Sequence, residues 1–235
     1  MTNRIIKRKL FKFESNNFID AHAEYYSNGD IVLVRPPMSH SAGKIVITAN
    51  RALPCMVAIN SYILENTNLT NKKTHILHLG VGLGYGLLDI SESLNAQQIT
   101  DCRLSGVDCE SYDGLRPPED SFYHKTRFYK CDAEHFIKSA KPVPDEFTIL
   151  VVDLFSDDGP IREVYDTLFW KKIKINIDPD IIAINTCYGE VTLSVISQVF
   201  DISAYKNNLF KNEITASPVE VYFIKKLDNS VGKDQ

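Results

Sequence analysis

The sequence predicts an α/β protein built on a doubly wound sheet, with a small β appendage at its N-terminus. Three observations support this prediction. Strand-like and helix-like segments alternate from residue 52 onward, a glycine-rich turn follows the first of those strands, and aspartates stand at the ends of three strands. Such alternation is typical of a parallel sheet with helices on both faces.

The first 51 residues form a segment of their own. Two strand-like runs, His22–Tyr26 and Ile31–Val34, flank an Asn28-Gly29 pair, which is a strong hairpin signal. We therefore divide the chain into a small β-hairpin region (1–51), a main domain (52–228) and a polar C-terminal tail (229–235).

In the main domain each element is predicted from its hydrophobic pattern. An amphipathic helix comes first, because Leu53, Met56, Ile59 and Ile63 recur at helical spacing. Further helices are expected near 87–94, 133–140, 164–175 and from 191, and strands at 75–79, 103–108, 127–132, 147–153 and 180–185, with a closing pair ending at 219–225. We expect the strands to form a parallel sheet whose ligands bind at the carboxyl ends.

The glycine turn indicates the type of ligand. Gly80, Gly82 and Gly84 would let the backbone turn tightly and approach a nucleoside without a Cβ in the way. The dinucleotide fingerprint G-x-G-x-x-G fails, because its third glycine would fall at Tyr85. The G-x-G-x-G spacing favours S-adenosylmethionine (SAM), and with it a Rossmann-like sheet of the class I SAM-dependent methyltransferase type. A plain strand-to-helix turn is the alternative.

Three strand-end acids are candidate ligands for that nucleoside and its reaction partner. Asp108 lies 22 residues after Gly86, close to the ~20-residue offset at which an acid meets ribose hydroxyls. Asp132 could accept a hydrogen bond from the adenine amino group, and Asp153 ends the fourth strand at the same edge. The alternative for each aspartate is a helix N-cap.

Composition and charge argue against two classes of function, nucleic-acid binding and membrane spanning. With a net charge of -4 the chain has no surplus of basic residues for nucleic acid, and no apolar run reaches the ~20 residues of a membrane span. We expect a cytoplasmic protein that binds neither nucleic acid nor a membrane. The five cysteines are scattered and never spaced as C-x-x-C, which favours reduced thiols and no metal site. His75 and His78, three apart on one strand, should face opposite sides of the sheet.

Two further segments carry a family resemblance. They are the run from Phe147 to Pro160, which contains Asp153, Ser156 and Asp157, and the run Tyr165–Trp170 that follows it. Both resemble segments of the spermidine synthase family, the polyamine aminopropyltransferases. The resemblance covers roughly residues 52 to 226. It implies transfer of an aminopropyl or other alkyl group from SAM or decarboxylated SAM to a small amine, without a metal. A homodimer is left as an alternative to a monomer.

By that resemblance, Asp153 handles the nucleophilic amine as the catalytic residue, Asp108 contacts the ribose and Asp132 the adenine. Asp157 would add negative potential on the amine side. Tyr188 is placed in the substrate pocket by its position after the fifth strand alone.

The chain also departs from the family pattern. Leu83 stands where the family has an acid that holds the aminopropyl ammonium. This difference keeps two alternatives open: a SAM-dependent methyltransferase, and a catalytically inactive member acting as a binding subunit. Leu83 favours the first of these, and Asp153 argues against the second.

Overall fold

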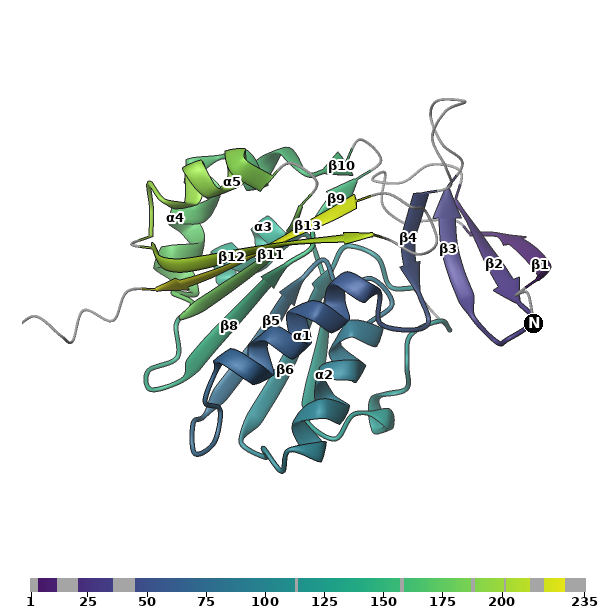
Figure 1. The fold of residues 1–235 in the computed structure, drawn as a ribbon, viewed down its shortest axis with the longest axis horizontal. Coiled ribbons are helices and arrows are strands. Elements are labelled where there is room, and N and C mark those ends of the chain that lie inside the picture. Colours follow the sequence, from purple (N-terminus) through teal and green to yellow (C-terminus); the bar gives the residue numbers. More distant parts are fainter. Residues whose placement is uncertain are drawn as a thin grey trace, which may run out of the picture.

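The computed structural model describes residues 4–11, 21–35, 45–112, 114–156, 159–186, 189–200, 202–211 and 218–226. Two sheets dominate it, a four-stranded one near the N-terminus and a seven-stranded one in the main domain. Figure 1 shows the small sheet at one end of the molecule, beside the larger one. The expected tail, 229–235, lies outside the described residues.

The N-terminal sheet is an antiparallel meander in the order β1-β2-β3-β4. Its strands are β1 (Ile5–Leu10), β2 (His22–Tyr26), β3 (Ile31–Arg35) and β4 (Ile45–Ala49). The predicted hairpin joins β2 to β3, and Gly29 adopts a φ of 90°, a left-handed conformation that glycine tolerates.

The main domain follows the predicted alternation. Its elements are α1 (Pro54–Asn66), β5 (Thr74–Leu79), α2 (Tyr85–Ala96), β6 (Cys102–Asp108), β7 (Lys125–Lys130), α3 (Ala133–Ser139), β8 (Phe147–Val152), the short ribbon β9 (Phe155–Ser156) and β10 (Gly159–Pro160), α4 (Thr167–Asn176), β11 (Ile181–Thr186), α5 (Gly189–Ile196), β12 (Ile202–Lys211) and β13 (Pro218–Lys226). Short 3-10 turns at Glu119–Ser121 and Arg162–Tyr165 complete it.

The large sheet has the strand order β12-β13-β11-β8-β5-β6-β7. The five strands from β11 to β7 are parallel to their neighbours, which confirms the predicted parallel core. At one edge the closing pair differs in direction, because β13 runs antiparallel to both β11 and β12. Only residues 212–217 join β12 to β13 in the chain, and a parallel pair needs a crossover of about a dozen residues or more, so a connection this short gives antiparallel pairing.

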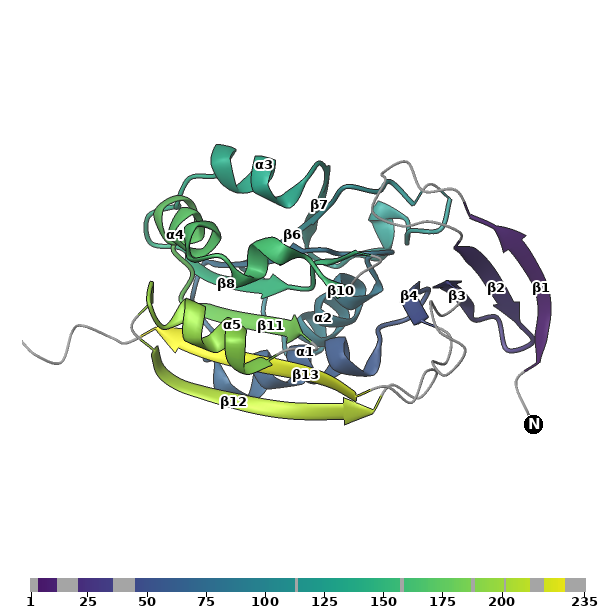
Figure 2. The same ribbon diagram turned by 90° about the horizontal axis from the view of Figure 1, so that it is seen from above.

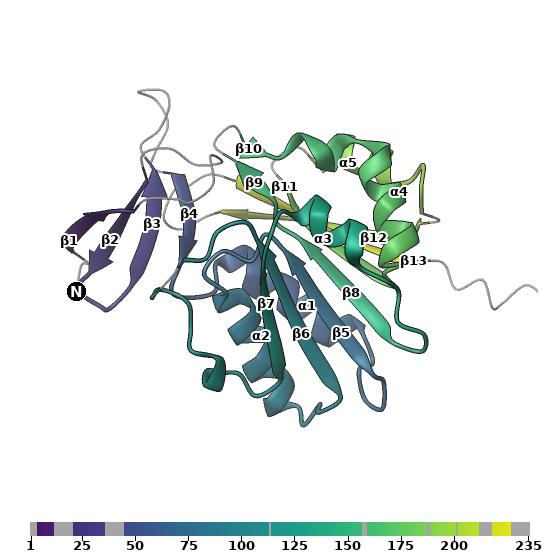
Figure 3. The same ribbon diagram turned by 180° about the vertical axis from the view of Figure 1, so that it is seen from behind.

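Helices cover both faces of this sheet, as Figures 2 and 3 show. One core cluster joins α1 and α2 to one face through residues such as Ile59, Leu87 and Ile76. A second cluster joins α3, α4 and α5 to the other face, around Trp170 and Leu77. The sheet is therefore doubly wound, and its ligand edge lies where β5, β6, β8 and β11 end.

In the described part of the chain, no helix is both long and apolar enough to span a membrane. The structure describes four cysteines, and these form no disulfide: Cys55, Cys102, Cys109 and Cys131.

Candidate functional site

The glycine turn lies between β5 and α2, at the carboxyl edge of the sheet, which we define as the ends of β5, β6, β8 and β11. Gly80, Gly82 and Gly84 have φ values of 80°, 55° and 92°. A Cβ on Gly80 would lie 2.1 Å from the carbonyl oxygen of Asp153, so this residue must be glycine for the turn to cross the end of β8. The turn thereby places the backbone of Asp153 directly beside it.

The other two glycines are also packed against protein atoms. A Cβ on Gly82 would lie 2.7 Å from Oγ1 of Thr48, in β4, and one on Gly84 would lie 3.0 Å from the ring of Phe128, in β7. We predicted that a ligand would lie close to the backbone of these glycines. In the structure, side chains of two strands, β4 and β7, lie close to Gly82 and Gly84 instead. Gly80 and Gly82 remain partly exposed, whereas Gly84 is buried.

Two strands hold the backbone of the turn by hydrogen bonds. The Gly82 N–H donates to Oδ2 of Asp108 at 2.8 Å, and the Leu83 N–H donates to Oγ1 of Thr48 at 3.1 Å. Asp108 ends β6, whereas Thr48 belongs to the small N-terminal sheet. Both sheets therefore determine the conformation of the turn.

Leu83 is part of the hydrophobic core. Its side chain is fully buried in a cluster with Ala23, Leu33 and Tyr112, where it packs against the N-terminal sheet. An apolar residue at this position is explained by packing.

Asp108 is held by main-chain donors on both oxygens. Besides the Gly82 bond, Oδ1 accepts from the Glu110 N–H at 3.0 Å. Burial raises the pKa of Asp108 to about 6, although these two hydrogen bonds and the charge of Arg116 lower it. A carboxylate has about four acceptor sites, so two accepted bonds leave capacity for ribose hydroxyls. The side chain is also partly exposed, as a ligand contact requires.

Asp153 follows β8 directly, and a residue that the sequence analysis did not single out contacts it. Nδ2 of Asn185, near the end of β11, donates to Oδ1 of Asp153 at 2.7 Å. Burial raises the pKa of Asp153 to about 7; the Asn185 bond lowers it, and the nearby Asp108 raises it further. A carboxyl group with a pKa near neutrality is suited to exchange a proton at physiological pH.

The same reasoning that selected the three aspartates could have selected Asn185. It is a polar residue at the end of a predicted apolar strand, and β11 pairs with β8 in a register that places Ile184 beside Val152. The next residues on the two strands, Asn185 and Asp153, are therefore neighbours. As an amide, Asn185 falls outside the pattern of strand-end acids, which explains why it was not predicted.

Asp132 has a local structural role. It is the N-cap of α3, and its Oδ1 accepts from the N–H groups of Glu134 and His135 at 2.7 and 3.3 Å. This is the alternative weighed for the strand-end acids, and the side chain is exposed. The predicted substrate residues Asp157 and Tyr188 lie outside the described residues.

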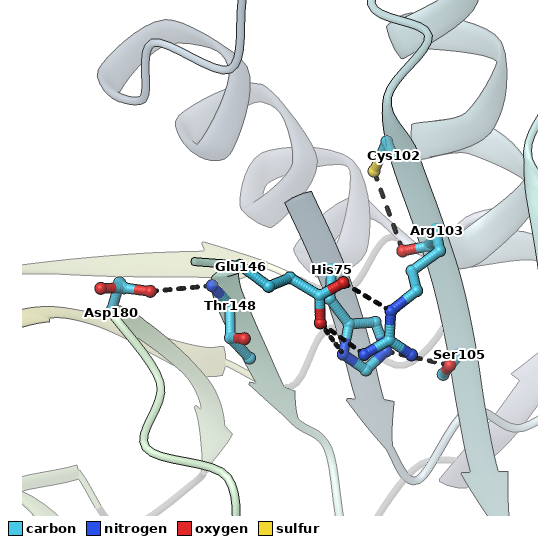
Figure 4. Close-up of polar contacts among 7 residues, drawn as sticks. All are labelled: His75, Cys102, Arg103, Ser105, Glu146, Thr148 and Asp180. Atoms are coloured by element: carbon cyan, nitrogen blue, oxygen red, sulfur yellow. Dashed lines mark hydrogen bonds and ion pairs between the residues drawn. The ribbon is translucent and has the colours of Figure 1, made fainter. Parts of the chain in front are cut away.

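The buried histidines face opposite sides of β5, as predicted. His75 lies in a polar network at the amino end of the strands, away from the carboxyl edge: its Nε2 is 2.9 Å from Oγ of Ser105, and Arg103 binds Glu146 with two nitrogens (Figure 4). Ser105 is only 2 % exposed, and Arg103 already engages Glu146, so the cluster is structural. His78 is buried, and its Nε2 has no partner among the described residues.

Two side chains at the carboxyl edge have unused hydrogen-bonding capacity. Asp108 retains acceptor capacity for hydroxyl groups, and Asn185 has a buried oxygen, Oδ1, for which no described residue supplies a donor. Both features suit a ligand rich in hydroxyl and amine N–H groups. Within the described ranges, no group of three or more His, Cys, Asp or Glu side chains could hold a metal ion.

Solved structures share the fold of this chain. The spermidine synthase from Thermotoga maritima superposes with a TM-score of 0.59 at 12% identity, over 95% of this chain and 72% of that one. A spermidine synthase in complex with the transition-state analogue AdoDATO gives 0.54 at 14% identity, over 95% and 73%. A putative class I SAM-dependent methyltransferase from Listeria monocytogenes gives 0.52 at 17%, over 79% and 63%.

The fold is that of the class I SAM-dependent methyltransferases. At these identities the likeness concerns the fold alone, which aminopropyltransferases and methyltransferases have in common. No protein-family model matches the sequence, and no curated protein is similar to it in sequence.

Proposed function

We propose that this protein is a SAM-dependent transferase that moves an alkyl group from SAM or decarboxylated SAM to an amine. The observation that carries the proposal is the placement of Asp153: a desolvated carboxyl group whose pKa is raised to about 7, beside the glycine turn and Asp108. The spermidine synthase and methyltransferase structures with the same fold support the donor class.

In this proposal, residues at the ends of different strands have different roles. Asp108 and the glycine turn hold the nucleoside, since they meet at the ends of β5 and β6. Asp153, at the end of β8, receives the proton that the amine loses. When bound, the sulfonium donor supplies an electrophilic carbon and a neutral thioether leaving group, so the protein needs no acid for departure.

Methyl transfer is the second candidate, and one observation favours it. The family acid that holds an aminopropyl ammonium is replaced by Leu83, whose apolar side chain is fully buried among Ala23, Leu33 and Tyr112. Nothing in the turn itself therefore repels the carboxylate of SAM or attracts the ammonium group of its decarboxylated form.

Calorimetric titration with SAM, decarboxylated SAM and methylthioadenosine tests the proposal. We expect at least one sulfonium to bind, and Asp108→Ala to weaken it about thirtyfold, which corresponds to about 2 kcal/mol. Tighter binding of SAM would select methyl transfer, and a strong preference for the decarboxylated form would select aminopropyl transfer. If none of the three compounds binds, the proposal is wrong.

Catalysis is tested separately with Asp153→Asn. Turnover should fall by ~10²-fold or more while donor affinity changes little, because the nucleoside contacts lie on other strands. Donor binding by the parent protein with no transfer to any amine would instead indicate the inactive binding subunit.

A further inference from the structure

The first strand of the small sheet, β1, has one open edge. It pairs with β2 on one side, and no described strand lies on its other side. Every residue of β1 is exposed, and Figure 2 shows the strand as the outermost one of the small sheet, on the side away from the large sheet. The open edge of a strand presents N–H and C=O groups with which another extended chain can pair.

The hydrogen bonds to β2 identify the groups of β1 that point outward. The N–H of Phe11, directly after β1, donates to the carbonyl oxygen of Ala21 at 3.1 Å. Alternate residues of an antiparallel strand turn their N–H and C=O groups to opposite sides, so Lys9 also bonds toward β2. The N–H and C=O groups of Arg8 and Leu10 therefore point to the open edge.

This edge is strongly basic. Four of the seven residues 4–10 are lysine or arginine and none is acidic, although the whole chain has a net charge of -4. Nε of Arg8 binds the buried Glu24 carboxylate at 2.8 Å, whereas Lys9 forms no ion pair with a described residue. Lysines on an edge strand oppose pairing with a copy of the same strand, because like charges on paired strands repel. The same charges attract an acidic strand.

A cavity lies beside the end of β1, between the small sheet and the loop that follows β6. Its volume is about 710 Å³, and its lining includes Lys9 and Leu10 of β1, Phe11, Tyr25 of β2 and Leu115 of the loop. This space can take an aromatic side chain, which would contact other rings, aliphatic groups and an ammonium group. An apolar site next to the basic edge therefore adds a second contact for a bound strand.

We propose that the open edge of β1 is a docking site for an acidic, extended segment of a partner protein. The segment adds a strand to the small sheet, and its main chain pairs with the outward groups of Arg8 and Leu10. Residues on one face of a strand are two apart, so carboxylates beside Lys7 and Lys9 stand two and four positions from an aromatic residue in the cavity.

The test uses the full chain and a fluorescein-labelled peptide of nine residues. Phenylalanine stands at its centre, glutamates stand two and four positions away on each side, and threonines fill the other positions. Fluorescence anisotropy at low salt should show saturable binding with a Kd below about 100 μM, and the affinity should fall as salt is added. Lysines in place of the glutamates should abolish binding, and so should methylation of every main-chain nitrogen. Alanine in place of phenylalanine should weaken it about tenfold.

Three variants locate the peptide on the protein. Lys9→Glu should weaken binding about tenfold or more. Lys171→Glu is the matched control, because it changes the net charge by the same amount at an exposed position of α4, at the other end of the molecule (Figure 1), and it should leave the affinity unchanged. Leu10→Pro removes an outward N–H and should abolish binding. It should keep the fold, checked by circular dichroism, because edge strands tolerate proline at such positions.

Several results would overturn the proposal. They are no binding at about 0.5 mM peptide, equal binding of the lysine peptide, and an unchanged affinity of Lys9→Glu, of Leu10→Pro or for the methylated peptide. Tighter binding of single-stranded DNA or of phosphatidylserine vesicles at the same salt would assign the basic edge to another class of partner. A parent dimer in sedimentation that Leu10→Pro dissociates would show that β1 pairs with a second copy. No sulfonium donor is used, so these outcomes are separate from those for the transferase function.

Discussion

Asp153→Asn is predicted to make the protein more stable at neutral and alkaline pH although it removes the carboxylate that we propose to be catalytic. The substitution keeps the shape of the side chain and leaves an oxygen that can accept from Asn185. It removes a charge whose burial raises the pKa of Asp153 to about 7. Functional groups of this kind are often held at the expense of stability.

The sign and magnitude follow from linkage. In the unfolded chain the pKa of aspartate is about 4, so the folded state binds the proton more tightly and the free energy of unfolding falls as the pH rises from 4 to 7. Three pH intervals at about 1.4 kcal/mol each give ~4 kcal/mol as the upper bound above pH 7. Because Asp153 is partly exposed, we expect water to reduce this to roughly 2 kcal/mol.

Urea unfolding of both proteins, followed by circular dichroism near pH 4, 6 and 8, measures the effect. The stability difference should be near zero at about pH 4 and should grow in favour of the variant toward pH 8, with equal m values. A difference that is independent of pH would refute the burial of an ionisable Asp153, and so would a variant less stable than the parent near pH 8.

Three further predictions concern the stability of the fold around the site. Gly80→Ala should destabilise the fold by more than about 3 kcal/mol, because the added Cβ would clash with the Asp153 carbonyl. Gly29→Ala is the control: Gly29 also has a positive φ, 90°, but open space around it, so this substitution should cost only about 1–2 kcal/mol in the same unfolding assay. Burial and Arg103 lower the pKa of His75 to about 4, so protonation of this residue opposes folding, and the parent should lose up to about 3 kcal/mol of stability between about pH 6.5 and 4. His75→Gln should remove this loss. Identical pH profiles of stability for the two proteins would contradict the prediction. Asp132→Ala should cost about 1 kcal/mol of stability and Asp132→Ser should restore it, since both aspartate and serine cap α3; equal stability of all three proteins would show that the cap contributes nothing.

Local patterns predicted the fold well where one signal determines one element. The Asn28-Gly29 pair predicted the hairpin, and the apolar run before Asp153 predicted β8 to within a residue. Strand ends predicted which side chains share the carboxyl edge, because parallel strands all finish there.

The remaining features depend on contacts between distant segments. Asp132 has the same local pattern as Asp108, but only the structure distinguishes the helix cap from the residue that holds the glycine turn. The antiparallel β13 and the contact of Asn185 with Asp153 depend on strand order, which a one-dimensional pattern does not specify. The burial of Leu83 could not be predicted either, because it requires the docked N-terminal sheet.

The bond from the Leu83 N–H to Thr48 makes the small sheet part of the same cooperative unit as the glycine turn. Separation of the N-terminal sheet from the main domain would release the turn at Leu83 and expose its buried side chain. Any compound that binds only the held turn therefore also opposes that separation, with a free energy that grows as RT ln(1 + [L]/Kd). Protection of residues 21–35 and 45–50 from hydrogen exchange should accordingly increase with ligand concentration, although these residues lie outside the large sheet.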